Sequence, residues 1–525
     1  MRRKWYLGFS LIVLAVFLTL VMLGHSLWFL LVLTFILIVG TYDWLQKKHS
    51  ILRNFPFIGH MRYILEFFRP EIQQYFIAND EEELPFNRET RTLIYERAKN
   101  IRDTVPFGTE RDIFQVGYTW VLHSLAPKHV DEIADRLMIG GVDCKKPYNA
   151  SRLNISAMSF GSLSPNAIMA LNKGAKLGGF AQNTGEGGLS PYHLQGGDLV
   201  FQIGTAYFGC RTEEGLFDEK AFKLIADLDD VKMIEIKLSQ GAKPSHGGIL
   251  PAAKVTKEIA LMRHVKMGHD VVSPAAHSAF KTPRELLQFI KQLRDLSSGK
   301  PIGFKLCVGR KDEFLGICKA MLETNILPDF ITVDGAEGGT GASPVEFTNH
   351  VGEPLDAGLT FVHNALVGIN LRNNIRIICS GKVANGFDMV LRIAMGADLC
   401  NAGRAMMMSV GCIQAKQCNS NTCPSGVATQ NIRLQRGLVV EEKQLRAANY
   451  HRNTMKSFLE IVGAMGLNNP SDLNPNFIMR RISDSIAKPF SEIYDYLKPG
   501  QLLDSTIPED FKKYWDMANA DRFSQ

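Results

Sequence analysis

The longest apolar stretch of the chain lies at its N-terminus. From Trp5 to Tyr42 there is no Lys, Arg, Asp or Glu, and only the polar triplet Gly24-His25-Ser26 interrupts the run. At about 1.5 Å per residue the run is too long to cross a hydrocarbon core of about 30 Å once, but divided at the triplet it provides two spans. The pattern predicts a transmembrane helical hairpin over residues 1–48.

Basic residues flank both ends of this hairpin. They are Arg2, Arg3 and Lys4 before it and Lys47, Lys48 and Arg53 after it. The positive-inside rule then places both ends in the cytoplasm, which predicts a multi-pass protein of the cell membrane with a cytoplasmic catalytic domain. A cleaved signal peptide is the alternative, but the apolar run is long for one and no small-residue cleavage site stands out.

From about residue 153 onward, short apolar runs alternate with amphipathic segments. Candidate strands are residues 153–159, 233–238, 302–308, 330–333, 376–380 and 398–402, and candidate helices include 165–177, 283–296, 314–323 and 387–395. Such alternation is typical of parallel α/β folds. Polar and charged residues repeatedly follow the strands, which favours a (β/α)8 TIM barrel, with its site at the C-terminal strand ends, over a doubly wound sheet.

Composition and charge limit the choices further. The chain has 525 residues, of which 46% are hydrophobic, so it can bury a large core. The net charge of +6 is modest, and no basic stripe interleaved with aromatic residues lies beyond the N-terminus, which argues against a nucleic-acid partner. We expect an α-rich capping or linker subdomain over residues 49–150, the barrel over 151–466, and a tail packed on the barrel over 467–525.

Glycines cluster where three consecutive candidate strands end. They are Gly335, Gly338, Gly339 and Gly341 after the strand that ends in Asp334, then Gly381, and then Gly403 beside Arg404. Glycine lets backbone amides approach an anion without obstruction, and late strand ends of a barrel commonly hold a phosphate. The spacing does not match a dinucleotide-binding fingerprint. These loops predict a phosphate site.

A second group of residues is cationic. Lys237 and Lys243 lie around the end of one candidate strand, with Gln240 between them, and Arg263 follows. Cations in an otherwise apolar domain bind carboxylates through charge-assisted hydrogen bonds, so we expect an acidic substrate rather than a simply solvated loop. A further glycine-rich loop, residues 183–188, contains one carboxylate, Glu186.

Three cysteines, Cys412, Cys418 and Cys423, lie within twelve residues, although the chain has only nine. Thiolates at this density favour binding to one shared metal centre. An iron-sulfur cluster suits converging soft thiolates. Zinc is a second possibility, with His451 as the nearest downstream histidine for a fourth ligand. Disulfide-bonded or free structural thiols are the third possibility. Nine is an odd number of cysteines, and the other six are scattered singly, mostly in apolar runs where free cysteine packs as a small hydrophobe.

Five motifs together resemble the FMN-binding synthase domain of glutamate synthase. They occur in the family's order across residues 150–465: Ser156-Ala-Met-Ser-Phe-Gly161, Asn183-Thr-Gly-Glu-Gly-Gly188, Ile236-Lys-Leu-Ser-Gln-Gly-Ala-Lys-Pro244, the run from Asp334 to Pro344, and the run from Gly411 to Gln430. The chain most resembles the stand-alone, membrane-anchored large-subunit-like proteins of bacteria. The resemblance implies a TIM barrel with FMN over the strand ends and a 3Fe-4S cluster held by Cys412, Cys418 and Cys423.

The resemblance also implies roles for individual residues. Lys237 and Glu186 would be catalytic, while Gln240, Lys243 and Arg263 would bind 2-oxoglutarate. Residues implied for FMN are Ala157, Met158, Ser159, Gln202, Lys305, Asp334, Gly335, Gly338, Gly339, Thr340, Gly341, Gly381, Gly403 and Arg404.

The expected function is that of an oxidoreductase acting on CH–NH2 donors. Electrons would pass from an electron-donor protein, a ferredoxin or an NAD(P)H-oxidising subunit, through the cluster to FMN, which would reduce the imine of 2-oxoglutarate to glutamate. Full glutamate synthases carry an N-terminal glutaminase domain where this chain has the apolar hairpin, and Ser245-His246 replaces the family's Gly-Glu. Alternatives are therefore an N-methylglutamate synthase-type enzyme, an amino-acid dehydrogenase, or a non-catalytic membrane-tethered electron relay.

Overall fold

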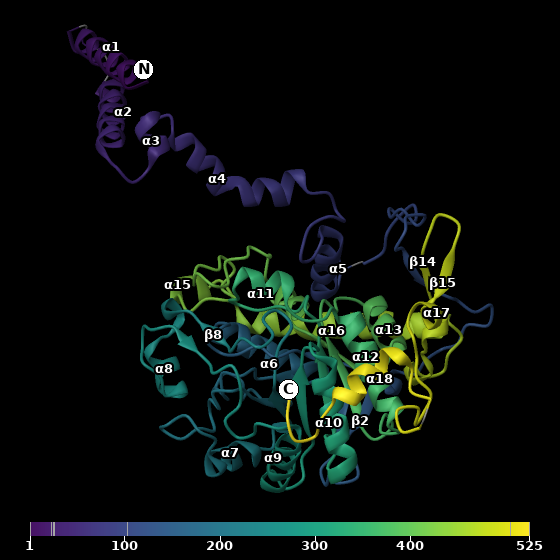
Figure 1. The fold of residues 1–525 in the computed structure, drawn as a ribbon. Coiled ribbons are helices and arrows are strands. Elements are labelled where there is room, and N and C mark those ends of the chain that lie inside the picture. Colours follow the sequence, from purple (N-terminus) through teal and green to yellow (C-terminus); the bar gives the residue numbers. More distant parts are fainter. Residues whose placement is uncertain (1, 23, 25–26, 102, 505, 524–525) are drawn as a thin grey trace. The chain divides into compact units, whose positions relative to one another are not determined.

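The computed structural model describes all residues except 1, 23, 25–26, 102, 505 and 524–525. The chain forms two compact units, Met1–Glu89 and Thr90–Gln525. Every residue that the sequence assigns to a substrate, cofactor or metal belongs to the second unit. The helices of the first unit and the closed barrel of the second are drawn in Figure 1.

The first unit is helical. Its elements are α1 (Arg2–Met22), α2 (Leu27–Leu45), α3 (Ser50–Asn54), α4 (His60–Ile72) and the π-helical turn η1 (Gln73–Ile77). Near the end of α2 the carboxylate of Asp43 is buried; it accepts a hydrogen bond from the Phe57 amide (2.9 Å) and lies 2.8 Å from Nε2 of His60. This contact joins α2 to the segment that follows it.

The predicted transmembrane hairpin requires correction. Within the described part of the chain, no helix has both the length and the apolar character that crossing a membrane requires. This finding overturns the predicted multi-pass membrane location. Of the predicted turn Gly24-His25-Ser26, the last two residues lie outside the described residues.

The centre of the second unit is a closed barrel of parallel strands, as predicted. In barrel order the strands are β4 (Leu153–Ile155), β5 (Gln182–Asn183), β6 (Leu199–Ile203), β7 (Val231–Lys237), β10 (Ile302–Leu306), β11 (Phe330–Asp334), β12 (Arg376–Ser380) and β13 (Leu399–Ala402). Asn401 of β13 pairs with Asn154 of β4, which closes the ring. Because all strands run in the same direction, their C-terminal ends meet at one rim.

Helices cover the outside of this barrel. They are α6 (Pro165–Gly178), α7 (Glu219–Ala226), α9 (Pro283–Leu296), α10 (Lys311–Thr324), α12 (Leu355–Gly368), α13 (Gly386–Ala394) and α16 (Val440–Ala464). Two of them begin in the same way: Ser164 caps the amide of Ala167, Thr282 caps that of Glu285, and a proline follows each cap. The sequence placed α6 and α9 correctly because these signals flank a clear apolar period.

A hairpin closes the N-terminal end of the barrel. It consists of β2 (Arg136–Ile139) and β3 (Tyr148–Ser151), which pair antiparallel. Its apolar side chains form one core with residues from the barrel strands; the cluster is Ile139, Tyr148, Ala150, Ala181, Val200, Met233, Phe330, Ile378 and Leu399. This end is therefore filled, which leaves the opposite rim for a ligand.

Further α-helices and β-strands of the second unit surround the barrel. They are β1 (Thr119–Val121), β8 (Ile249–Leu250), α8 (Lys257–Arg263), β9 (Val271–Val272), α11 (Val345–His350), α14 (Arg404–Ser409), α15 (Ile432–Gln435), β14 (Ile478–Arg481), β15 (Ala487–Pro489), α17 (Phe490–Ile493) and α18 (Glu509–Met517). Strands β1, β14 and β15 form a small sheet that brings residues from both sides of the barrel sequence together. Helix α5 (Arg88–Lys99) precedes them and begins at the boundary of the two units.

Candidate active site

A buried ion pair lies at the C-terminal end of β7. The ammonium of Lys237 donates hydrogen bonds to Oε1 of Glu186 (2.7 Å) and to Oε1 of Gln240 (2.6 Å). Lys237 is 8% exposed, and Glu186 comes from the loop after β5. Burial alone would raise the pKa of Glu186, but Lys237, and then Lys243 and Arg263, hold it below its usual value. Glu186 is therefore ionised at neutral pH.

Two further cations are buried around this pair. Burial, reinforced by repulsion from Lys237, lowers the pKa of Lys243 to about 8, while burial lowers that of Arg263 to about 10. Lys243 donates to the carbonyl of Ala342 (2.8 Å) and Arg263 to that of Phe160 (2.7 Å). Nε of Arg263 is buried and has no hydrogen-bond partner among the residues that the structure describes. Three cations against one carboxylate leave positive charge for an anionic ligand to neutralise.

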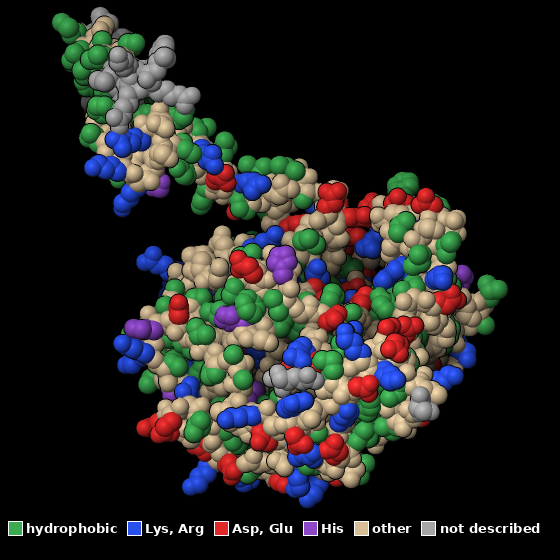
Figure 2. Space-filling model, viewed as in Figure 1, with side chains coloured by type: hydrophobic (Ala, Val, Ile, Leu, Met, Phe, Trp, Pro, Cys, Tyr) green, Lys and Arg blue, Asp and Glu red, His purple; other side chains and the backbone are tan. Residues whose placement is uncertain are grey.

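Glycines permit this close packing. A β-carbon at Gly204 or Gly248 would overlap the Glu186 side chain, and one at Gly187 would overlap the guanidinium of Arg263. Gly187 of the glycine-rich loop thus makes room for Arg263, while glycines from the loops after β6 and β7 make room for Glu186. Figure 2 shows acidic and basic side chains interspersed over the visible face of the second unit.

Strands β10 and β11 contribute a second ion pair. Nζ of Lys305 lies 3.1 Å from Oδ2 of Asp334, which also accepts a hydrogen bond from the amide of Gly241 (2.9 Å). Burial alone would lower the pKa of Lys305, but Asp334 and then Glu235 raise it above its usual value. Asp334 thus ties the loop after β7 to the end of β11.

The glycine loop after β11 lies against Arg404, the first residue of α14. A β-carbon at Gly339 would contact the Arg404 side chain, and Nη2 of Arg404 donates to the carbonyl of Glu337 (2.6 Å). Lys382 follows β12. Burial lowers its pKa, and repulsion from the nearby guanidinium of Arg404 lowers it further. The structure therefore brings two cations and a glycine-lined loop together, as a phosphate site requires.

The residues after β4 continue the rim beside β13, because these two strands pair. Gly185 packs so closely on Met158 and Ser159 that a β-carbon there would overlap their backbone, and Oγ of Ser159 donates to Oγ of Ser162 (3.0 Å). Ala157 lies in the same segment, and Gln202 on β6 donates to Glu235 (2.7 Å). Thr340 and Gly341, in contrast, are exposed, so the structure does not bring them to these buried contacts.

The three clustered cysteines lie in one loop. All nine cysteines are free, which removes the disulfide alternative in this structure. The pKa of Cys412 is raised to about 12, mainly by burial and further by the nearby thiols of Cys418 and Cys423. However, no group of three or more His, Cys, Asp or Glu among the described residues is arranged to hold a metal ion. The predicted 3Fe-4S cluster is therefore not shown.

His451, the fourth ligand considered for the zinc alternative, is engaged with other partners. The ring of His451 stacks on Phe180, and Nε2 lies 2.9 Å from Oγ of Ser151 and 3.1 Å from the carbonyl of Leu153. His451 lies on α16, and these partners hold its ring against the start of β4. His451 is a structural core residue.

Comparison with known proteins identifies the chain's relatives. A family model described as a conserved region in glutamate synthase matches residues 122–468. The chain belongs to the glutamate synthase family. It is 39% identical over 481 residues to the glutamate synthase large subunit-like protein YerD of Bacillus subtilis, a match that covers 84% of this chain and 91% of YerD. The predicted family and enzyme class, a glutamate synthase-like oxidoreductase, are confirmed.

More distant relatives cover less of the chain. The archaeal glutamate synthase (NADPH) of Methanocaldococcus jannaschii is 34% identical over 324 residues, which cover 61% of this chain and 60% of that protein. Among solved structures, a mandelate oxidase variant with (S)-mandelic acid aligns at a TM-score of 0.40 and 12% identity, over 71% of this chain and 86% of that one. A likeness this low carries no argument about function.

Two buried residues at this rim have no signal in the sequence motifs. Glu235 lies within β7, where the surrounding residues are apolar, and Lys254 lies in a short 3-10 turn (Ala252–Lys254). Nζ of Lys254 donates to the carbonyl of Ser162 (2.7 Å). Burial lowers the pKa of Lys254 to about 8, opposed by Cys418 and Cys423. The sequence could have indicated a buried functional residue only where a charge interrupts an apolar run. That signal is present for Glu235 and absent for Lys254.

Proposed function

We propose that this chain is an FMN-dependent enzyme that reduces the imine of 2-oxoglutarate to glutamate. The observation that carries the proposal is the hydrogen-bonded arrangement of Lys237, Glu186 and Gln240 at the C-terminal rim of the barrel, with the buried cations Lys243 and Arg263 beside it. A dicarboxylate compensates the excess positive charge of this arrangement better than a neutral substrate does.

The residues divide the work by their contacts. Lys243 and Arg263 bind the carboxylates of the substrate, since neither forms a direct ion pair of its own among the described residues. Gln240 and Glu186 hold the ammonium of Lys237 in one place, where it orients the oxo acid or donates a proton at the carbon-nitrogen centre. Burial of all three cations excludes water, which strengthens each of these interactions.

The residues present fit FMN. Lys382, Arg404 and the loop around Gly339 provide cations and open backbone for a phosphate, and Lys305 with Asp334 provides a fixed ion pair at the neighbouring strand ends. FMN, when bound, supplies the hydride for the reduction. The same rim offers Ser159 and Gln202 as hydrogen-bonding partners for the ring system.

The cysteine loop fits an iron-sulfur cluster in its chemistry but not in its described geometry. Three free thiols, two of which raise the pKa of the third, Cys412, suit a cluster of negative charge, and the cation of Lys254 lies near Cys418 and Cys423. The thiols are not gathered as ligands in this structure. We propose these three cysteines as the cluster ligands, and metal analysis tests that assignment separately. Electrons for FMN are supplied by a partner protein.

One experiment tests this function against its alternatives. Purified protein is photoreduced under anaerobic conditions and then titrated with 2-oxoglutarate plus ammonium, while the flavin absorbance is followed. Reoxidation with formation of glutamate is expected. Reoxidation only with methylammonium in place of ammonium supports an N-methylglutamate synthase-type enzyme. Reduction of oxidised flavin by glutamate, without the reverse reaction, supports a dehydrogenase, and no response to any amine supports an electron relay.

A further inference from the structure

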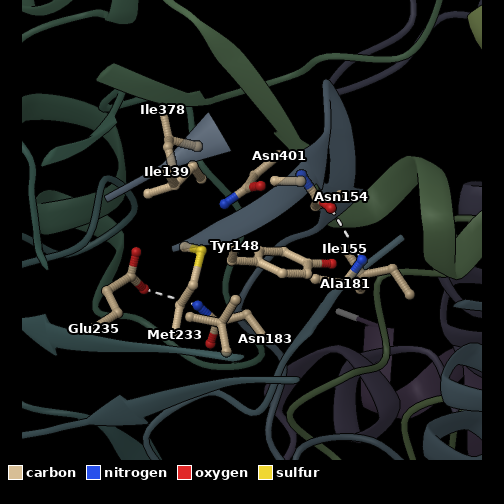
Figure 3. A pocket seen from close by; sticks show the side chains of 12 residues that line it. Ile139, Tyr148, Asn154, Ile155, Ala181, Asn183, Met233, Glu235, Ile378 and Asn401 are labelled. Atoms are coloured by element: carbon tan, nitrogen blue, oxygen red, sulfur yellow. Dashed lines mark hydrogen bonds between the residues drawn. The ribbon is translucent and has the colours of Figure 1, made fainter. Parts of the chain in front are cut away.

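A buried carboxylate lies inside the barrel beneath the candidate active site. Glu235 of β7 is 1% exposed. Its Oε1 accepts hydrogen bonds from Nδ2 of Asn183 (2.8 Å) and Nε2 of Gln202 (2.7 Å), and its Oε2 accepts one from the hydroxyl of Thr332 (2.5 Å). Figure 3 shows Glu235 pointing toward Asn183, with the hydrogen bond drawn between them. One side chain thus connects β5, β6, β7 and β11.

This carboxylate determines the orientation of two side-chain amide groups. Since Glu235 only accepts hydrogen bonds, it requires the NH2 groups of both Asn183 and Gln202 to face it, so their amide oxygens face away. The freed oxygen of Asn183 accepts a hydrogen bond from the backbone amide of Gly185 (2.9 Å). The orientation of Asn183 therefore holds the loop that carries Glu186.

The contacts return to the strand on which they begin. Glu186 follows Gly185 directly and accepts a hydrogen bond from Lys237. Lys237 lies two residues after Glu235 on β7, and side chains at this spacing point to the same face of a strand. Glu235 and Lys237 are therefore coupled twice, once through β7 and once through Asn183 and the loop after it.

We propose that Glu235 is a positioning residue for the Glu186–Lys237 pair and for Gln202. It acts through the orientation of the Asn183 and Gln202 side chains and does not touch the substrate. Its effect on catalysis rests on the proposed function, but its effect on the loop 183–188 does not. This role differs from a general contribution to stability because it depends on which end of the contact donates: Nδ2 of Asn183 donates and Oε1 of Glu235 accepts.

The space around Glu235 favours an isosteric test. A cavity of about 10 Å³ adjoins it, lined among others by Asn154, Asn183 and Asn401, and this volume corresponds to roughly one water. Removing the side chain would enlarge this cavity and admit solvent. Glu235→Gln keeps the volume and replaces one acceptor by a donor, so it disturbs the orientation of the amides and little else.

Glu235→Gln is expected to free the loop and to slow the reaction. Hydrogen exchange of residues 183–188, measured on protein without cofactor or substrate, should become at least tenfold faster. In the flavin-loaded protein, kcat should fall about tenfold or more with a small change in KM, because misplacement of Lys237 affects the transition state more than binding. The flavin absorbance spectrum should also shift through Gln202.

A second variant separates orientation from simple damage. In Asn183→Asp combined with Glu235→Gln, the new amide donates to the new carboxylate, which still accepts from the Gly185 amide. Exchange of residues 183–188 should return to within about threefold of the parent, and kcat should recover in part. The spectral shift through Gln202 should remain, because Gln202 donates to the same oxygen of Glu235 as Asn183 does and now faces a donor. If Glu235→Gln alone yields no folded protein, recovery of folded protein in the double variant supports the proposal and its failure overturns it.

Asp329→Asn is the matched control. Asp329 is equally buried but precedes β11 at the N-terminal end of the barrel, where it accepts from the amides of Gly141 (2.7 Å) and Ile302 (2.8 Å) and pairs with Arg294. Its replacement should lower thermal stability and leave exchange of residues 183–188 unchanged. The proposal is overturned if Asp329→Asn accelerates that exchange as much as Glu235→Gln, or if the double variant exchanges no more slowly than Glu235→Gln. Absence of imine reduction in the parent would instead contradict the proposed function, because the exchange measurement needs no substrate.

Discussion

Gly248 lies so close to Glu186 that a β-carbon on Gly248 would overlap the Glu186 carboxylate. Gly248 comes from the loop after β7, and Glu186 comes from the loop after β5. Gly204, after β6, approaches the same carboxylate. The position of Glu186, and with it that of the Lys237 ammonium, therefore depends on bare backbone on two neighbouring loops.

Gly248→Ala should displace Glu186 and weaken its contact with Lys237. We expect kcat/KM to fall tenfold or more, since a displacement of about 1 Å in an active site can have a large effect on rate. Steady-state kinetics of the purified variant measure this. Gly309→Ala is the control, because nothing lies within 4 Å of a β-carbon there; equal losses in the two variants would contradict the assigned contact.

Lys243 should give the reaction an alkaline limit. Its pKa is lowered to about 8 by burial and then by Lys237, and a lysine attracts a carboxylate only while it is protonated. As the pH rises through this value the charge is lost, so kcat/KM for 2-oxoglutarate should fall about tenfold per pH unit above it.

Lys243→Arg tests the origin of that limit. Arginine stays protonated over the whole range, so the alkaline fall should disappear between about pH 7 and 9 even if the maximum rate is lower. A pH profile of kcat/KM for parent and variant provides the measurement. An unchanged alkaline limb in the variant would assign the limit to another group.

Arg263→Met should weaken the binding of the acidic substrate and leave FMN bound. Loss of one charged hydrogen bond costs about 1.5 to 3 kcal/mol, so KM for 2-oxoglutarate should rise about tenfold or more. The chain offers a matched control in Arg211→Met, since both guanidinium groups lie over the ring of Phe208, at 5.2 Å and 5.5 Å. If both variants raise KM equally, packing on Phe208 and not charge explains the effect.

The barrel was predictable where its strands are long and apolar. Strand β12 and helix α9 have the predicted limits, Arg376–Ser380 and Pro283–Leu296. Strand β5, at two residues, is too short to produce a pattern of its own, and only closure of the ring reveals it. The predicted strand over 153–159 is shorter in the structure, ending at Ile155, because the residues after it turn into the rim.

The site was predictable in part for the same geometric reason. Parallel strands bring Lys237, Lys305 and Asp334 to one rim wherever they lie in the sequence. The sequence could not indicate that Glu235 accepts three hydrogen bonds, because its partners lie on three other strands. Nor does the spacing of the cysteines determine how their thiols are arranged; proximity in sequence left Cys412, Cys418 and Cys423 in one loop without a described metal-binding geometry.

Metal analysis decides the role of that loop. If it holds a 3Fe-4S cluster, anaerobically purified protein should contain about three iron atoms per chain, and Cys418→Ser should lose the iron while FMN remains, since the proposed flavin contacts lie on other loops. Cys318→Ser is the control: Cys318 is buried within α10 without charged neighbours that affect its pKa, so its replacement should leave the iron content unchanged. Zinc without iron, or iron that survives replacement of each of the three cysteines in turn, would contradict the assignment.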